Sequence, residues 1–158
     1  METFPHIEGE DLEGRAVEVP AGLPPFPVVL LVAFHRHHYR VVATWHEEVR
    51  ALTASGPMPE VFEVAAMPKL YSTSKDLIDD GMRSAVPDPE ARTHTLSIYT
   101  DVGEFARALG LRSLDTVYVY LTGGDGRIRW SEEGEPDPAK LAELARVLAE
   151  PDAPPEEI

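Results

Sequence analysis

One segment, Val28 to Phe34, restricts the fold more than any other part of the sequence. It reads VVLLVAF, an uninterrupted apolar run rich in β-branched side chains, and Pro27 precedes it. Such a strand is typical of a sheet covered on both faces, because successive side chains point to opposite faces and all of these are apolar. The apolar stretch is about half of the ~20 residues that cross a bilayer, so we interpret it as a buried central strand.

Strand and helix patterns alternate along the rest of the chain. The expected elements are a hairpin in Glu10 to Pro20, the strand Val28 to Phe34, a helix from about His38, a strand Val61 to Ala66, a helix after Lys69, a strand His94 to Thr100, a helix Asp101 to Leu109, a hairpin Thr116 to Ser131 and a helix from Pro138. Strand–helix–strand crossovers place helices over the sheet. We therefore predict an α/β fold of three layers, with a mixed central sheet, helices on both faces and an N-terminal hairpin.

Local signals mark several boundaries of these elements. Gly123 to Gly126 (GGDG) predicts a hairpin turn, and Gly110 stands where a left-handed helix C-cap is needed. Asp137 before a proline predicts an N-cap followed by the first helical residue. Thr73 with Asp76 fits a capping box for the helix after Lys69.

The chain length predicts one domain. With 158 residues it falls in the range of single hydrophobic cores, which we place at residues 1–149. Residues 150–158 are dominated by Pro, Asp and Glu, and they carry too little apolar surface to offset chain entropy. We expect this acidic tail to be disordered.

Charge excludes two classes of partner. There are 28 acidic and 14 basic residues, a net charge of −14 at pH 7. Nucleic acid and anionic lipid both require clustered Lys and Arg, so we expect no nucleic-acid binding and no membrane insertion. The N-terminus has no basic region followed by an apolar run, which favours a cytoplasmic location over secretion.

Cysteine is absent from the sequence. This excludes disulfides, thiolate metal sites, iron–sulfur clusters and every cysteine-based redox or nucleophilic mechanism for this chain.

The order of elements, together with Tyr99 to Leu111 and Thr116 to Ile128, resembles the thioredoxin-like superfamily in its larger version, found in peroxiredoxins and related membrane-tethered oxidoreductases. The resemblance implies that chemistry belongs where the first long strand meets its helix. It places the two redox cysteines near Tyr39 and Val42, and the facing cis-proline near Asp115. Neither the two cysteines nor the proline is present at these positions, so the resemblance implies the scaffold without the redox mechanism.

A second set of residues resembles one branch of this superfamily, the mitochondrial assembly factor for the membrane sector of ATP synthase and its uncharacterised bacterial relatives. The residues that carry it are Phe34, Arg36 and His38 at alternate positions, Trp45, the segment Asp79 to Arg83, and Tyr99-Thr100-Asp101. The implied role is that of a chaperone-like assembly factor.

Histidines gather at the same junction. Four of the six lie within twelve positions, namely His35, His37, His38 and His46. Imidazole is a common ligand of divalent transition metals. Two ligands converge if His35 and His37 share one face of an extended segment, or if His35 and His38 stand one helical turn apart. A third ligand would have to come from His46, His94 or a carboxylate. The alternative is that these are exposed residues at a helix start.

Arg36 and Arg40 flank the histidines. Together with the free N–H groups of a helix N-terminus they would attract an anion such as a carboxylate or phosphate. The alternative is that both arginines pair with acidic residues. Asp115 could act as a base or orient the imidazole of His38, provided that the two come within hydrogen-bond reach.

Three functional hypotheses follow. The first is a redox-inactive domain that binds a protein or small-molecule partner in a cleft. The cleft candidates are Arg36, His38, Tyr39, Arg40 and Asp115. The second is a metal- or anion-dependent enzyme using the segment His35 to Arg40, and the third is a structural subunit that forms a homo-oligomer.

Overall fold

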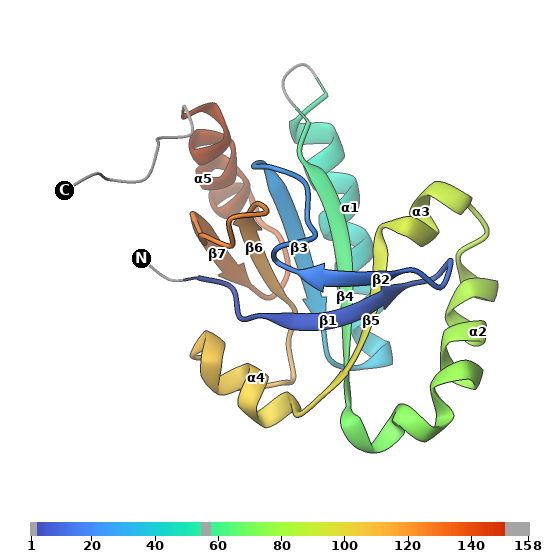
Figure 1. Ribbon diagram of the computed structural model, residues 1–158. Coiled ribbons are helices and arrows are strands. Elements are labelled where there is room, and N and C mark those ends of the chain that lie inside the picture. Colours follow the sequence, from blue (N-terminus) through green and yellow to red (C-terminus); the bar gives the residue numbers. More distant parts are fainter. Residues whose placement is uncertain (1–2, 55–57, 151–158) are drawn as a thin grey trace.

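The computed structural model describes residues 3–54 and 58–150. Its core is a seven-stranded sheet with the order β2-β1-β5-β4-β3-β6-β7 (Figure 1). The strands are β1 Ile7–Asp11, β2 Ala16–Val19, β3 Val28–Ala33, β4 Glu60–Pro68, β5 Thr95–Thr100, β6 Tyr118–Thr122 and β7 Trp130–Glu133. The central strands β3, β4 and β5 are parallel, while β1 and β6 pair antiparallel with β5 and β3.

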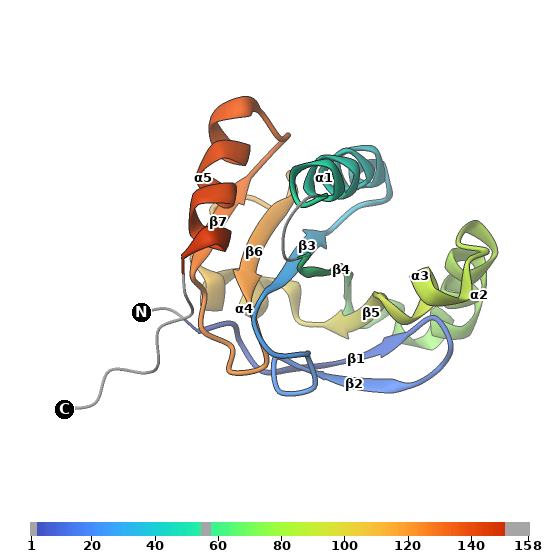
Figure 2. The ribbon, with the colours of Figure 1, turned by 90° about the horizontal axis from the view of Figure 1, so that it is seen from above.

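Five α-helices surround the sheet. They are α1 Tyr39–Leu52, α2 Lys75–Ala85, α3 Pro89–Thr93, α4 Val102–Leu109 and α5 Pro138–Ala149. Seen from above, α1 and α5 lie over one face and α4 lies across the other, with α2 and α3 beside β5 (Figure 2). The predicted three-layer α/β fold with a mixed sheet and an N-terminal hairpin is therefore confirmed.

Strand β3 is buried on both faces, as its composition predicts. Leu30 and Val32 belong to a core that includes Phe105 of α4. Leu31 points to the opposite face and belongs to a second core around Trp45 of α1. Each fully buried side chain of this size contributes about 1.5–3 kcal/mol, so the two cores fix α1 and α4 on opposite sides of the sheet.

Three local predictions are confirmed in the backbone. Gly110 has φ +69° and caps α4, and the side chain of Asp137 accepts a hydrogen bond from the N–H of Lys140 at the start of α5. The turn Gly123 to Gly126 joins β6 to β7, although regular pairing begins only at Leu121 and Trp130.

Other local predictions are wrong or incomplete. The capping box of Thr73 and Asp76 does not form, because a 3-10 helix occupies Lys69–Ser74 and α2 begins at Lys75, with Ser74 as an N-cap that makes no side-chain bond. The short helix α3 was not expected. Its five residues are too few to show periodicity, and it depends on the Asp88 carboxylate, which accepts from Glu90 N–H.

Two predictions are not decided by this fold. Residues 151–158 of the predicted acidic tail lie outside the described residues, while Glu150 is the C-cap of α5. No helix in the described part of the chain is long and apolar enough to cross a membrane.

Candidate functional site

The candidate site lies where β3 ends and α1 begins. The chain leaves β3 at Ala33 and makes a 3-10 turn, Arg36–His38, before α1 starts at Tyr39. This junction is at the carboxyl ends of the parallel strands β3 and β4, the edge at which open α/β sheets commonly bind ligands.

His38 is part of the framework of this junction. Its side chain is buried, at 3% exposure, and its Nδ1 accepts hydrogen bonds from the N–H groups of Phe34 (3.1 Å) and His35 (3.3 Å). Burial, followed by the nearby His37 and His35, lowers the pKa of His38, while Asp115 opposes the shift. Because Nδ1 accepts, the neutral ring carries its proton on Nε2, which is buried without a hydrogen-bond partner among the described residues.

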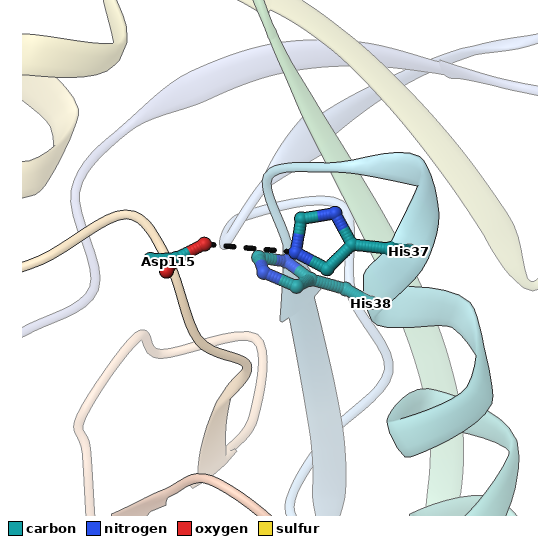
Figure 3. Close-up of side chains that lie close together, drawn as sticks. All are labelled: His37, His38 and Asp115. Atoms are coloured by element: carbon teal, nitrogen blue, oxygen red, sulfur yellow. Dashed lines mark ion pairs between the residues drawn. The ribbon is translucent and has the colours of Figure 1, made fainter.

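The imidazole of His37 lies beside Asp115 (Figure 3). Its Nε2 is 3.6 Å from Asp115 Oδ1, and the two side chains are 69% and 81% exposed. One ligand atom from each of His37, His38 and Asp115 lies within 4.8 Å of the other two. His35 is outside this group and stacks on His37, with the ring centroids 5.3 Å apart.

The structure therefore groups the predicted metal ligands differently from the sequence prediction. The set is His37, His38 and Asp115 instead of His35, His37 and His38. The carboxylate of Asp115 pairs with His37, and among the residues that the structure describes no hydrogen bond joins it to the imidazole of His38. The condition set for Asp115 to act on His38, a hydrogen bond between their side chains, is therefore not met among the described residues.

The main chain offers less to an anion than expected. The N–H groups of Phe34 and His35 bind His38 Nδ1, and those of His38 and Tyr39 bind the carbonyls of His35 and Arg36. These four groups are already used within the junction and are not free to bind an anion.

A groove opens between α1 and α2 on the sheet face that α1 covers. Its volume is about 680 Å³, and a smaller cavity of about 370 Å³ adjoins it and shares Phe34, His35 and Arg36. The residues lining the groove are Ala33, Phe34, His35, Arg36, Tyr39, Ala43, Glu63, Ala65, Ala66, Met67, Leu77, Ile78, Gly81, Met82, Ala85 and Val86. Most of these side chains are apolar, as in small-molecule sites.

Helix α2 forms one wall of this groove with its apolar side. Leu77, Ile78, Met82 and Ala85 lie on one side of the helix and line the groove, and Leu77 is 78% exposed.

Polar contacts hold α2 to the sheet instead. Tyr99 on β5 donates its hydroxyl to Asp79 Oδ1 (2.9 Å), and Lys75 binds both Asp79 and Glu10 of β1. Burial, followed by the contact with Asp79, raises the pKa of Tyr99, so its hydroxyl stays protonated and donates.

A second contact holds α2 near its C-terminal end. Arg83 donates Nε–H to the carbonyl of Leu12 at 2.6 Å. Because the polar side of α2 makes these attachments, its apolar side is left for the groove.

Three polar side chains lie within the groove without using their hydrogen-bonding groups. Arg36, Tyr39 and Glu63 line it, and none makes a side-chain hydrogen bond or ion pair with another described residue. Burial raises the pKa of the Glu63 carboxyl, and burial together with Glu63 raises the pKa of Tyr39. Titratable groups with shifted pKa values in an apolar cleft are typical of binding or catalytic sites.

The predicted site residues thus occupy different positions. Arg36 and Tyr39 line the groove. His38 is buried within the junction and Asp115 lies beside His37, and neither of these two residues lines the groove. Arg40 is exposed on the first turn of α1 and lines neither cavity.

Glu63 and the groove wall formed by α2 were not predicted from the sequence. A signal was present for Glu63, because it is the single charged residue within the apolar run VFEVAA of β4. No sequence signal distinguishes a helix face that lines a groove from one that packs in a core.

Comparisons with known proteins place this geometry in a known architecture. No protein-family model and no curated protein matches the chain. Solved structures do match over nearly the whole length. BsSco, a member of the Sco family of cytochrome c oxidase assembly proteins, has a TM-score of 0.63 at 13% identity over 93% of this chain and 91% of its own. The chain has a thioredoxin-like fold.

Two further structures support the thioredoxin-like fold. The thioredoxin domain of a thiol-disulfide oxidoreductase from Bacteroides vulgatus matches with a TM-score of 0.57 at 12% identity, over 93% of this chain and 96% of its own. ScoI of Bradyrhizobium japonicum, solved with copper bound, matches with a TM-score of 0.53 at 14% identity, over 92% of this chain and 98% of its own. At these identities the likeness establishes the thioredoxin-like fold alone. The expected thioredoxin-like fold is confirmed.

Proposed function

We propose that this chain is a redox-inactive thioredoxin-like domain that binds a protein or small-molecule partner in the groove between α1 and α2. The observation that carries the proposal is the groove itself, with a volume of about 680 Å³ and a mostly apolar lining. Pockets of ~300–1,000 Å³ with apolar walls and a few polar groups are typical ligand sites.

The exposed apolar residues support the same proposal. Three of the large hydrophobic side chains that stay exposed lie at these cavities. Tyr39 and Leu77 line the groove, and Tyr71 lines the smaller cavity that adjoins it. Exposed apolar surface that is concentrated in one region commonly marks a binding surface.

The absence of cysteine from the chain supports binding over thiol chemistry. Tyr39 and Val42 stand near the positions where the resemblance to thioredoxins places redox cysteines, and Asp115 stands near the cis-proline position. Without a thiolate this chain has no group to attack a disulfide or a peroxide.

An assembly-factor role is a finer form of this proposal. The sequence resemblance to the ATP synthase assembly factor implies a chaperone-like protein that holds an apolar segment of another chain. The groove offers an apolar surface for such a segment. A cytoplasmic location fits this role, and it stays a prediction, as does a homo-oligomer.

The groove is tested with the neutral fluorescent probe N-phenyl-1-naphthylamine. We expect saturable binding to the full chain and loss of binding in Gly81→Leu. Gly81 lines the groove within α2, and a Cβ there meets no atom within 4 Å, so a leucine fills the space and strengthens the helix. Ser84→Leu, at an exposed position of α2 that does not line the groove, is the control. Equal probe binding to wild type and Gly81→Leu would refute the groove as the binding site.

The cluster of His37, His38 and Asp115 favours a second candidate, a divalent-metal site used by a metal-dependent enzyme. Three ligand atoms within 4.8 Å of one another are close enough to share one ion. One feature opposes it. A metal on Nε2 of His38 needs the lone pair there, which moves the proton to Nδ1, where two N–H groups already donate.

Binding of Zn²⁺ decides between these two candidate functions. For the metal site, untagged protein should bind one equivalent of Zn²⁺ in calorimetry, with a loss of binding in both His37→Ala and Asp115→Asn and none in His46→Gln. If neither wild type nor any of the three variants binds Zn²⁺, the partner-binding domain is the better proposal.

A further inference from the structure

We propose, on the basis of the groove as the binding site, that its ligand is a small amphiphilic anion. The hydrocarbon part would lie along the apolar wall of α2 and the floor of β4, with the anionic head group at the end of the groove where Arg36 stands.

The apolar part of the groove is continuous. Its floor includes Ala65 and Met67 of β4, and its wall includes Ile78, Met82 and Ala85 of α2. Small alanines leave room along the floor, while the methionines are flexible and adapt to the shape of a hydrocarbon chain. No charged side chain of α2 lines the groove.

The head-group end has positive charge that nothing in the described chain neutralises. Arg36 lines the groove, Arg40 lies one turn further along the chain, and neither forms an ion pair with a described residue. The first turns of the 3-10 helix Arg36–His38 and of α1 contain no acidic residue. This is unusual in a chain with a net charge of −14, in which acidic residues outnumber basic ones two to one. An unpaired arginine beside an apolar groove suits a carboxylate, because its planar guanidinium binds both oxygens.

Glu63 and Tyr39 complete the polar end. Burial raises the pKa of the Glu63 carboxyl and of the Tyr39 hydroxyl, which shifts each group toward the protonated form that can donate to an anionic oxygen. Ionised Glu63 would repel the same head group. A cationic head group would meet Arg36 instead.

Competition with bound N-phenyl-1-naphthylamine tests the proposal at pH 7. We expect decanoate to displace the probe, and decyltrimethylammonium, which has the same chain length, to displace it at least tenfold less well. Arg36→Gln should weaken decanoate about tenfold or more, because a charged hydrogen bond is lost. Arg146→Gln on α5 changes the net charge equally at a site remote from the groove and should leave decanoate binding unchanged.

Glu63→Gln is the second arm. It removes the repelling charge and retains a donor, so at pH 8 it should bind decanoate several-fold more tightly than wild type. Weaker binding by this variant, or unchanged binding by Arg36→Gln, would place the head group elsewhere and overturn the proposal.

The outcomes also separate this inference from the proposed function. If Gly81→Leu abolishes probe binding but decanoate does not displace the probe, the anionic ligand is overturned and the groove remains a binding site. Failure of the probe to distinguish wild type from Gly81→Leu would overturn both.

Discussion

At the scale of single residues, His38 has a structural role that its sequence context does not suggest. Its Nδ1 joins two main-chain N–H groups at the end of β3, a function that an acceptor on a rigid ring performs well. Without that acceptor, two donors at the junction lose their partner.

His38→Ala should therefore lower the free energy of unfolding by about 1–3 kcal/mol, the cost of leaving such donors unsatisfied. His38→Asn keeps an acceptor oxygen on a short side chain and should recover part of this loss. Urea denaturation of the three proteins measures the difference. Equal stability of His38→Ala and wild type would show that the two hydrogen bonds contribute little.

The pH dependence of stability gives a second prediction for the same residue. Burial keeps the pKa of folded His38 below its ordinary value of 6.5, so the unfolded chain binds the proton more readily. The contribution of His38 to the free energy of unfolding is complete above about pH 6.5. It is lost as the pH falls from that value toward the lower pKa of His38 in the folded protein.

The stability advantage of wild type over His38→Asn should accordingly shrink between pH 7.5 and pH 5. His94 has the opposite sign: burial acts to lower its pKa, but hydrogen bonds with Glu60 and Glu90 raise it. Since His94 is the same in both proteins, its effect cancels in the comparison. If the stability advantage of wild type over His38→Asn grows as the pH falls, the lowered pKa of His38 is contradicted.

At the scale of elements, helices here are terminated and attached by different means. Gly110 ends α4 in a left-handed conformation, whereas Gly81 lies inside α2 with ordinary helical geometry. The same substitution should have opposite effects at these two positions.

Gly110→Ala should destabilise the protein by about 1 kcal/mol, because a Cβ disfavours φ +69°. Gly81→Ala should stabilise it by about 0.5–1 kcal/mol, because a Cβ there meets nothing and alanine favours helix. Thermal unfolding of the two variants provides the test. A shift in the same direction for both would contradict the prediction.

The attachment of α2 gives a further prediction. Tyr99→Phe removes the hydroxyl that binds the buried carboxylate of Asp79, so α2 should detach more readily from the sheet. Hydrogen exchange should become faster in α2 and stay unchanged in α1. Tyr71→Phe is the matched control, since that hydroxyl has no hydrogen-bond partner among the described residues. Faster exchange throughout the chain would indicate general destabilisation instead.

At the scale of the whole molecule, the net charge of −14 opposes the compact state. Adding NaCl up to about 0.15 M reduces the screening length to ~8 Å and weakens this repulsion. The melting temperature should therefore rise between low salt and 0.15 M NaCl, as scanning calorimetry would record. A fall over this range would show that ion pairs such as Lys75–Asp79 outweigh the repulsion.

Much of the fold could be predicted because its signals are local. The apolar run of β3 follows from a burial pattern within one segment, and Gly110 and Asp137 act on the backbone within a few residues. The candidate site could be predicted only in part. The junction at Arg36 and Tyr39 was found, since the order of elements implies it.

The tertiary structure alone decided what meets at that junction. Leu77 has the spacing of a core residue, and only the polar attachment of α2 to the sheet leaves it exposed beside a groove. Asp115 and Glu63 are far from the histidines in sequence and reach the junction through strand pairing. Backbone preferences and hydrophobic periodicity depend on neighbours in the chain, so the sequence by itself determined the elements and their order. Contacts between distant side chains depend on how those elements pack, and only the folded chain determined them.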